Sequence, residues 1–238
     1  MKNDDSSFSP LPDAEGPRVI AFIGPNGSGK SSVANLLKIT TVVPGDQRYT
    51  GSITYDKASG KILLPLVNPD EIAKAVRAGS PNLDKDDCDR IAFDRANKIR
   101  GMLADAKIDF GFETVGSHHS KAEFLERLKQ EGYYVAVLFI STEDARINVR
   151  RVKQRQLTGG HDVPTDKVVN RYQRTMRLLP RYFNVADFMA VYDNSEDHTK
   201  TDGIGPKLLL VKRDGNAIVT ENGHDSAWLK EYLPEAFD

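Results

Sequence analysis

The chain has 238 residues, a formal net charge of −1 at pH 7, and a content of 39% hydrophobic and 28% charged residues, values typical of a soluble globular protein. No apolar run approaches the length of a membrane span, and the N-terminal residues contain no signal-peptide core. The single cysteine, Cys88, excludes an internal disulfide and a cysteine metal cluster, so we expect a cytoplasmic protein with no membrane partner.

The N-terminal part contains the strongest motif in the sequence. Residues 1–16 are predicted to be a flexible tail, residues 19–23 a buried parallel strand and residues 31–37 a helix. Residues 24–31 read Gly-Pro-Asn-Gly-Ser-Gly-Lys-Ser and match the phosphate-binding pattern G-x-x-x-x-G-K-[ST]. Backbone N–H groups of such a loop converge on phosphates, while the lysine reaches the β- and γ-phosphates and the last hydroxyl ligates Mg²⁺. The predicted ATP contacts are Gly24, Pro25, Asn26, Gly27, Ser28, Gly29, Lys30, Ser31 and Ser32, with Ser31 as the metal ligand.

The segment after the first helix interrupts the alternation of strands and helices. Residues 45–66 are expected to form an inserted hairpin, in which residues 52–55 and 61–64 turn through 58–60. The apolar run 62–67 is predicted to be a strand of the main sheet.

Strands and helices then alternate to residue 200. Further strands are expected at 110–112, 134–140 and 188–192. Helices are expected at 84–106, 120–130, 142–157 with Ser141 as a cap, and 166–179 with Thr165 as a cap and Pro180 at its end. This alternation predicts an α/β fold of three layers with a mainly parallel sheet over residues 17–200. Residues 201–238 are expected to add a hairpin (208–220), which turns at Asp214-Gly215, and a helix (226–232).

The motifs that the sequence lacks favour a kinase among the nucleotide-binding classes. There is no N-K-x-D guanine-specificity motif, no LSGGQ-type transporter signature and no apolar run that ends in an Asp-Glu pair. A small-molecule kinase needs instead a carboxylate that takes the proton of the acceptor hydroxyl, and basic groups that close over the phosphoryl group.

Two carboxylates follow predicted strands, where such a fold places its ligand site. Asp70 lies in Asn68-Pro69-Asp70 after the strand that ends at Val67, and its alternative role is that of a helix N-cap. Asn68 and Asp70 are both predicted to contact the substrate. Glu113, with Thr114 beside it, follows the strand 110–112, and its alternative role is an ion pair with an arginine.

A basic segment supplies the positively charged groups that such a kinase needs. Between Arg146 and Arg181 there are eight arginines and two lysines against two aspartates, which gives a net charge of +8. Such a block suits a solvated helix face, a nucleic-acid surface or a phosphate clamp, and the excess of arginine favours the clamp. Residues 150–175 are therefore predicted to be a lid, which consists of two helices and a glycine-containing loop. Its candidate catalytic residues are Arg151, Arg155, Arg171 and Arg174.

Taken together, the motifs resemble those of the zeta-toxin family of kinases. The resemblance covers about residues 20–195 and rests on the segments 22–31, 67–73, 112–114 and 159–164 with Arg171-Tyr172. It implies a P-loop kinase that uses ATP to phosphorylate a hydroxyl of UDP-N-acetylglucosamine. It also implies that Lys30 binds ATP, that Asp70 is the catalytic base and that Glu113 and Thr114 lie at the sugar-nucleotide site. Family members are held inactive by a small helical antitoxin at the ATP site, so such a partner is implied as well.

Several alternatives stay open. The acceptor could instead be another metabolite, a nucleoside, an antibiotic or an RNA end, or the chain could be a non-catalytic ATP-binding switch. The basic segment has few interleaved aromatic residues, which argues against nucleic acid. The inserted and C-terminal segments lie outside the motif region, and they put the sugar-nucleotide acceptor in doubt more than the type of reaction.

Overall fold

The computed structural model describes residues 15–36, 39–41, 54–56, 61–157, 163–196 and 205–237. The predicted tail lies almost wholly outside the described residues, as do Gly159, Gly160 and His161 of the predicted lid loop. Within the described part, no helix combines the length and the apolar character that crossing a bilayer requires.

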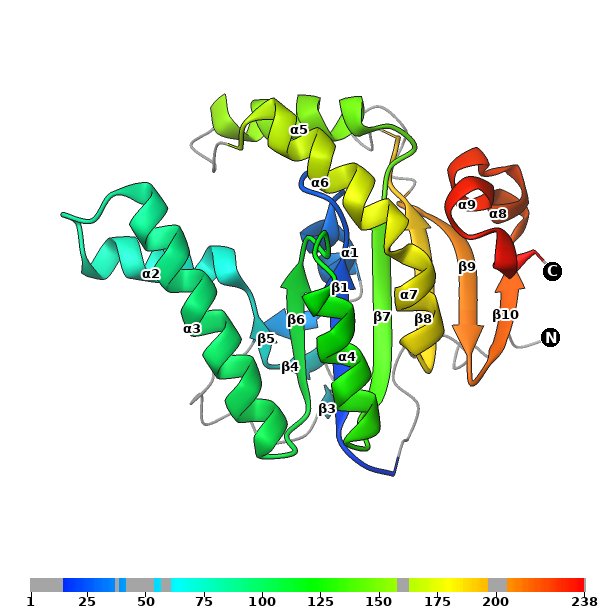
Figure 1. Cartoon of the computed structure of the whole chain (residues 1–238), viewed down its shortest axis with the longest axis horizontal. Coiled ribbons are helices and arrows are strands. Elements are labelled where there is room, and N and C mark those ends of the chain that lie inside the picture. The colour runs from blue at the N-terminus through cyan, green and yellow to red at the C-terminus, as the bar shows by residue number, and fades with distance from the viewer. Residues whose placement is uncertain are drawn as a thin grey trace.

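A seven-stranded sheet forms the centre of the molecule, in the order β10-β9-β8-β7-β1-β6-β5 (Figure 1). Its five parallel strands are β1 (Arg18–Ile23), β5 (Leu66–Val67), β6 (Phe110–Thr114), β7 (Tyr134–Ser141) and β8 (Phe188–Asp193). The antiparallel hairpin of β9 (Lys207–Arg213) and β10 (Asn216–Val219) extends one edge. The predicted α/β fold with a mainly parallel sheet is therefore confirmed.

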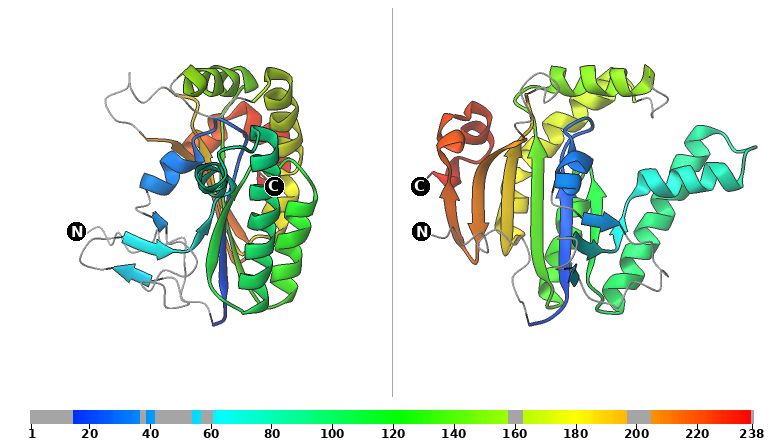
Figure 2. Two further views of the ribbon diagram at one scale, coloured as in Figure 1. Left: turned by 90° about the vertical axis from the view of Figure 1, so that its left-hand side faces the viewer. Right: turned by 180° about the vertical axis from the view of Figure 1, so that it is seen from behind.

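Helices and a small sheet cover the two faces of the main sheet (Figure 2). The helices are α1 (Lys30–Leu36), α2 (Pro69–Gly79), α3 (Lys85–Asp105), α4 (Ser120–Gln130), α5 (Ala145–Leu157), α6 (Thr165–Arg177), α7 (Leu179–Val185), α8 (Glu221–Asp225) and α9 (Ala227–Tyr232), followed by one 3₁₀ turn (Pro234–Ala236). In β1, alternate residues point to opposite faces, because the side-chain period of a strand is two. Val19, Ala21 and Ile23 join the core under α3, α4 and α7, whereas Ile20 and Phe22 pack with Val33 of α1.

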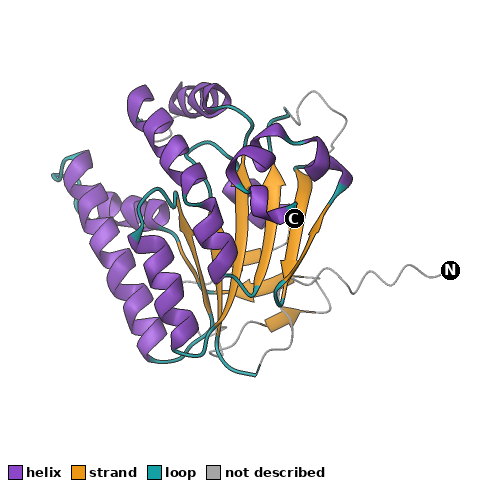
Figure 3. Ribbon diagram, turned by 45° about the vertical axis from the view of Figure 1, so that its right-hand side comes forward, coloured by secondary structure: helices purple, strands orange, loops and turns teal. Residues whose placement is uncertain are grey.

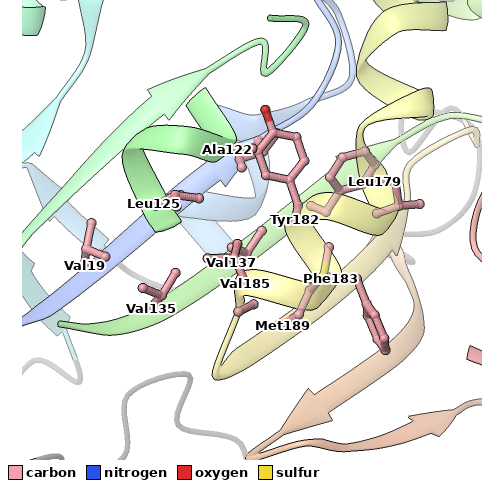
Figure 4. Packing of buried hydrophobic residues seen from close by; sticks show 14 of the residues in the cluster. Val19, Ala122, Leu125, Val135, Val137, Leu179, Tyr182, Phe183, Val185 and Met189 are labelled. Atoms are coloured by element: carbon pink, nitrogen blue, oxygen red, sulfur yellow. The ribbon is translucent and has the colours of Figure 1, made fainter. Parts of the chain in front are cut away.

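The larger of the two cores contains Tyr182, the largest fully buried side chain of the described residues. Tyr182, from α7, inserts between α4 and β7 (Figure 4), and its hydroxyl donates a hydrogen bond of 2.9 Å to the carbonyl of Gly116. The side-by-side helices on this face stand in front of the strands in Figure 3. This packing holds the loop between β6 and α4 at the carboxyl edge of the sheet.

The inserted segment contributes two of the strands of a separate three-stranded sheet. The strands are β2 (Ile39–Thr41), which precedes the predicted insertion, β3 (Thr54–Asp56) and β4 (Lys61–Leu64), in the order β2-β4-β3. The antiparallel pairing of β3 with β4 confirms the predicted hairpin, whereas the parallel pairing of β2 with β4 was not predicted. The prediction of one strand over 62–67 is wrong, because Pro65 separates β4 from β5. Proline has a fixed φ angle and no backbone N–H, so it ends one ladder before the next begins.

Three helix boundaries also differ from the predictions. Helix α5 begins at Ala145, and Ser141 is the last residue of β7 rather than a cap. Thr165 lies inside α6, and Pro164 occupies the N-cap position. Pro180 lies in the first turn of α7 instead of ending the preceding helix, since the missing N–H of proline costs nothing there.

At the C-terminus, the hairpin turn at Asp214 (φ 49°) and Gly215 (φ 88°) is confirmed. The predicted helix is α9, with Ser226 as its N-cap, whereas the short helix α8 was not predicted.

Candidate active site

The predicted phosphate-binding loop connects the end of β1 to the start of α1, at the carboxyl edge of the sheet (Figure 1). Its glycines are required by close backbone approaches. A Cβ atom on Gly24 would lie 2.0 Å from the carbonyl oxygen of Ile140. Gly29 has a φ of +92°, and a Cβ there would lie 2.0 Å from Nδ2 of Asn194. The loop therefore has the strand, turn and helix that phosphate binding needs.

Three side chains from distant elements donate hydrogen bonds to this loop, two of them to its backbone. Asn148 of α5 donates a hydrogen bond of 2.7 Å to the carbonyl of Asn26. Asn194, which directly follows β8, donates one of 2.8 Å to the carbonyl of Ser28. Arg171 of α6 donates to Oδ1 of Asn26 at 3.3 Å. Neither asparagine that donates to the loop was predicted from the sequence, although the position of Asn194 directly after a buried strand was a usable signal.

Lys30 folds back over the loop. Its ammonium group donates to the carbonyl of Gly24 at 2.8 Å and to that of Pro25 at 3.2 Å. Burial lowers the pKa of Lys30, while the negative charges of Glu113 and Asp70 act in the opposite direction. The residue next in the chain, Ser31, is exposed. Lys30 and the two predicted carboxylates are therefore close enough to interact electrostatically.

Asp70 lies in the first turn of α2 and is exposed. The N-cap of this helix is Asn68, whose side-chain oxygen accepts a hydrogen bond of 2.9 Å from the backbone N–H of Asp70. Pro69 occupies the first helical turn, as expected for a rigid turn. The alternative role of Asp70 as the cap is therefore wrong, and its carboxylate remains available at the sheet edge. The predicted substrate contact Asn68 has a structural role in the capping bond.

Glu113 and Thr114 are the last two residues of β6, so the prediction that they follow the strand is wrong. Both residues pair with β1, Glu113 with Phe22 and Thr114 with Ile23, so the strand continues to Thr114. Burial raises the pKa of the half-buried Glu113, Lys30 lowers it, and Asp70 raises it. The cation that acts on Glu113 is therefore Lys30 and not an arginine. Thr114 accepts a hydrogen bond of 3.2 Å from the N–H of Gly116 and so shapes the turn after the strand.

The four predicted lid arginines divide into two groups. Arg171 contacts the loop, and the exposed Arg155 acts electrostatically on Lys30. Arg151 instead donates to the backbone carbonyls of Asn194 at 2.6 Å and Glu196 at 2.8 Å. Arg174 is exposed and donates to the carbonyl of Asn170 in its own helix, at 3.4 Å. The structure thus brings two of the four to the loop, and Arg151 fixes the segment after β8.

A cavity of about 890 Å³ lies on the other side of that segment, at the C-terminal hairpin and helices. Trp228 of α9 lies in its wall and donates a hydrogen bond of 2.5 Å to Asp193, the last residue of β8. Asp193 also accepts one of 2.7 Å from the N–H of Ser195. The C-terminal segment is thereby joined, through Asp193 and the adjacent Asn194, to the phosphate-binding loop.

Comparison with known proteins places this site in a family. An uncharacterized protein of Haemophilus influenzae is 24% identical over 155 residues, which make up 65% of this chain and 92% of that protein. A chain of the AvrRxo1-ORF1:AvrRxo1-ORF2 complex solved with ATP superposes with a TM-score of 0.63 at 17% identity, over 89% of this chain and 63% of that chain. The present chain thus corresponds to less than two thirds of that one.

A structure of the PezAT chromosomal toxin–antitoxin system of Streptococcus pneumoniae superposes with a TM-score of 0.50 at 13% identity, over 93% of this chain and 88% of that chain. Because the sequence identities to the two solved structures are only 17% and 13%, these two similarities support the fold alone. The sequence match is broader, because residues 4–201 match the zeta toxin family. The chain therefore belongs to the zeta toxin family.

Proposed function

We propose that this protein is an ATP-dependent kinase that phosphorylates a hydroxyl group of a small molecule. The observation that carries the proposal is the electrostatic coupling of Lys30, Asp70 and Glu113 beside a phosphate-binding loop. These residues come from three different elements, α1, α2 and β6, and meet at the carboxyl edge of the sheet. Ligands of open α/β sheets bind at this edge.

In this proposal Asp70 is the general base. Its carboxylate takes the proton of the acceptor hydroxyl while the hydroxyl oxygen attacks the γ-phosphorus of ATP. The bond between the γ-phosphorus and the bridging oxygen breaks, and its electron pair leaves with ADP. General-base catalysis of this kind contributes a rate factor of about 10²–10⁴.

Lys30 and two arginines stabilise the charge on the transferred group. When ATP binds, the ammonium group of Lys30 exchanges its hydrogen bonds with the carbonyls of Gly24 and Pro25 for hydrogen bonds to the β- and γ-phosphates. The new hydrogen bonds are stronger because the donor and the acceptor carry opposite charges. Arg155 and Arg171 lie on the helices that cross the loop, and they complete the positive surroundings of the phosphoryl group.

The residues present fit a magnesium ion. In the part of the chain that the structure describes, no three His, Cys, Asp or Glu side chains gather into a metal-binding group. Mg²⁺ in kinases is held by one or two protein oxygens together with substrate phosphates. The exposed residue Ser31 carries a hydroxyl that would supply such an oxygen. When bound, the ion neutralises phosphate charge.

We propose a UDP-amino sugar such as UDP-N-acetylglucosamine as the acceptor. The family resemblance supports this choice, and so does the half-buried carboxylate of Glu113 next to Thr114, because a carboxylate accepts hydrogen bonds from sugar hydroxyl and amide groups. We also propose a small helical antitoxin as a partner, since the PezAT relative belongs to a toxin–antitoxin system.

The test is incubation of the full chain with ATP, Mg²⁺ and UDP-N-acetylglucosamine, followed by mass spectrometry. We expect the sugar nucleotide to gain one phosphate in the presence of the wild-type chain and not in the presence of Lys30→Ala. A phosphate gain only on another metabolite would overturn the acceptor and leave the kinase. ATP binding without phosphorylation of any metabolite in a broad extract would overturn the kinase itself.

A further inference from the structure

A cluster of two cations and an exposed aromatic ring lies between α3 and α4. Phe93, Asn97 and Arg100 lie on one face of α3, since they are four and three residues apart. Lys121, in the first turn of α4, faces them: its ammonium group lies 3.4 Å from Oδ1 of Asn97 and 5.0 Å from the ring centre of Phe93. We call these four residues the α3–α4 cluster.

Within the described part of the chain, the positive charge of this cluster has no carboxylate partner. Arg100 is only 3% exposed, and it donates to the same Oδ1 of Asn97 that Lys121 approaches. Its guanidinium lies 5.1 Å from the ring centre of Phe112, and the face of that ring attracts a cation more weakly than a carboxylate does. Among the described residues, no acidic side chain forms an ion pair with Arg100 or Lys121. Burial lowers the pKa of Arg100 to about 10, and burial together with the charge of Arg100 lowers that of Lys121 to about 8.

The cluster is connected to the candidate active site through β6. Residues 115–119 join the end of β6 to the start of α4, so the first turn of α4, with Lys121, lies at the carboxyl edge of the sheet, where β6 ends with Glu113 and Thr114. Phe112, which Arg100 covers, directly precedes Glu113 in β6. An acceptor whose hydroxyl reaches Asp70 could therefore extend toward α4.

We propose that the α3–α4 cluster is the subsite that binds the phosphate groups of a nucleoside diphosphate acceptor. This inference rests on the proposed kinase function and adds the residues that select the acceptor. Lys121 contacts the phosphates, and Arg100 lies behind it as a second, buried positive charge. Phosphates supply the negative charge that this cluster lacks. Phe93, which is 50% exposed, offers a ring on which a nucleobase stacks.

Binding can be measured without catalysis, which separates this inference from the proposed function. The full chain is first saturated with a non-hydrolysable ATP analogue, so that the phosphate-binding loop is occupied. Titration calorimetry then measures the affinity for UDP and, separately, for uridine. The variants are Lys121→Ala, Lys121→Arg as a conservative rescue, and Lys98→Ala as a matched control. Lys98 is an exposed lysine on α3, outside the cluster.

We expect Lys121→Ala to weaken UDP binding about tenfold or more, the usual effect of removing a hydrogen bond to a charged group. Uridine binding should stay unchanged in that variant, and Lys121→Arg and Lys98→Ala should bind UDP like the wild-type chain. Equal UDP affinities of Lys121→Ala and Lys98→Ala would overturn the inference, and so would a wild-type chain that does not bind UDP. If UDP binds as expected but no acceptor is phosphorylated, the subsite stands and the kinase proposal fails.

Discussion

Arg100→Met should stabilise the protein in the absence of ligands, because it removes a buried charge that pairs with no carboxylate in the ranges that the structure describes. The pKa of Arg100 is lowered from 12.5 to about 10 by burial, and each pKa unit corresponds to about 1.36 kcal/mol, so the charged form carries a penalty of about 3 kcal/mol. Methionine keeps an unbranched apolar chain in the same space. The variant loses the contacts of the guanidinium with Phe112 and Phe124, which at 5.1 and 6.0 Å lie toward the limit of such contacts and are worth about 0.5–1 kcal/mol each. The expected net gain is about 1–2 kcal/mol in the free energy of unfolding.

The measurement is urea and thermal unfolding at pH 7, followed by circular dichroism. For a chain of this size, the expected gain corresponds to a rise of roughly 2–8 °C in the melting temperature. Arg95→Met is the matched control, since Arg95 is an exposed arginine of the same helix, and its effect should stay within about 0.5 kcal/mol. If Arg100→Met lowered the free energy of unfolding while the control did not, the guanidinium would be a net stabilising group and its charge would not be a cost of folding.

Three further predictions follow from the contacts described above. Because the pKa of Lys121 is lowered to about 8, the affinity for UDP should fall between pH 7 and pH 9.5 as the ammonium group loses its proton, and Lys121→Arg should remove this dependence; calorimetry across that range tests both. ATP binding should change the fluorescence of Trp228, the sole tryptophan, since it is joined to the segment after β8, and Asn194→Ala should remove most of that response. Arg151→Ala should weaken ATP binding, because it frees that segment, whereas Arg155→Ala should lower kcat with little change in ATP affinity; steady-state kinetics with nucleotide titration separate the two effects.

Local sequence signals predicted the elements that depend on neighbouring residues. The phosphate-binding loop with its strand and helix, the helix Ser120–Gln130 and the turn at Asp214-Gly215 follow from short motifs and from hydrophobic periodicity. The capping role of Asn68 was also visible, since Asn before Pro at a helix start is a known pattern. Asp70 was instead considered for the cap, although Pro69 marks the first helical turn.

Features that depend on pairing across the chain were not predictable in this way. The pairing of β2 with β4 joins segments that local patterns do not connect. Asn148 and Asn194 reach the phosphate-binding loop from more than 120 residues away. Lys121 and Asn97 meet only because α3 and α4 pack on the same face of the sheet. Single polar residues in helices look like solvated surface positions until the fold brings them together.

The proposed kinase chemistry depends on Asp70 as the general base. A comparison of the wild-type chain with Asp70→Asn, with ATP, Mg²⁺ and UDP-N-acetylglucosamine, tests this role if phosphorylated product and ATP affinity are followed together. We predict that Asp70→Asn binds ATP nearly as well as the wild-type chain and loses about 10²–10⁴-fold in turnover. Full turnover in Asp70→Asn would show that Asp70 is not the base.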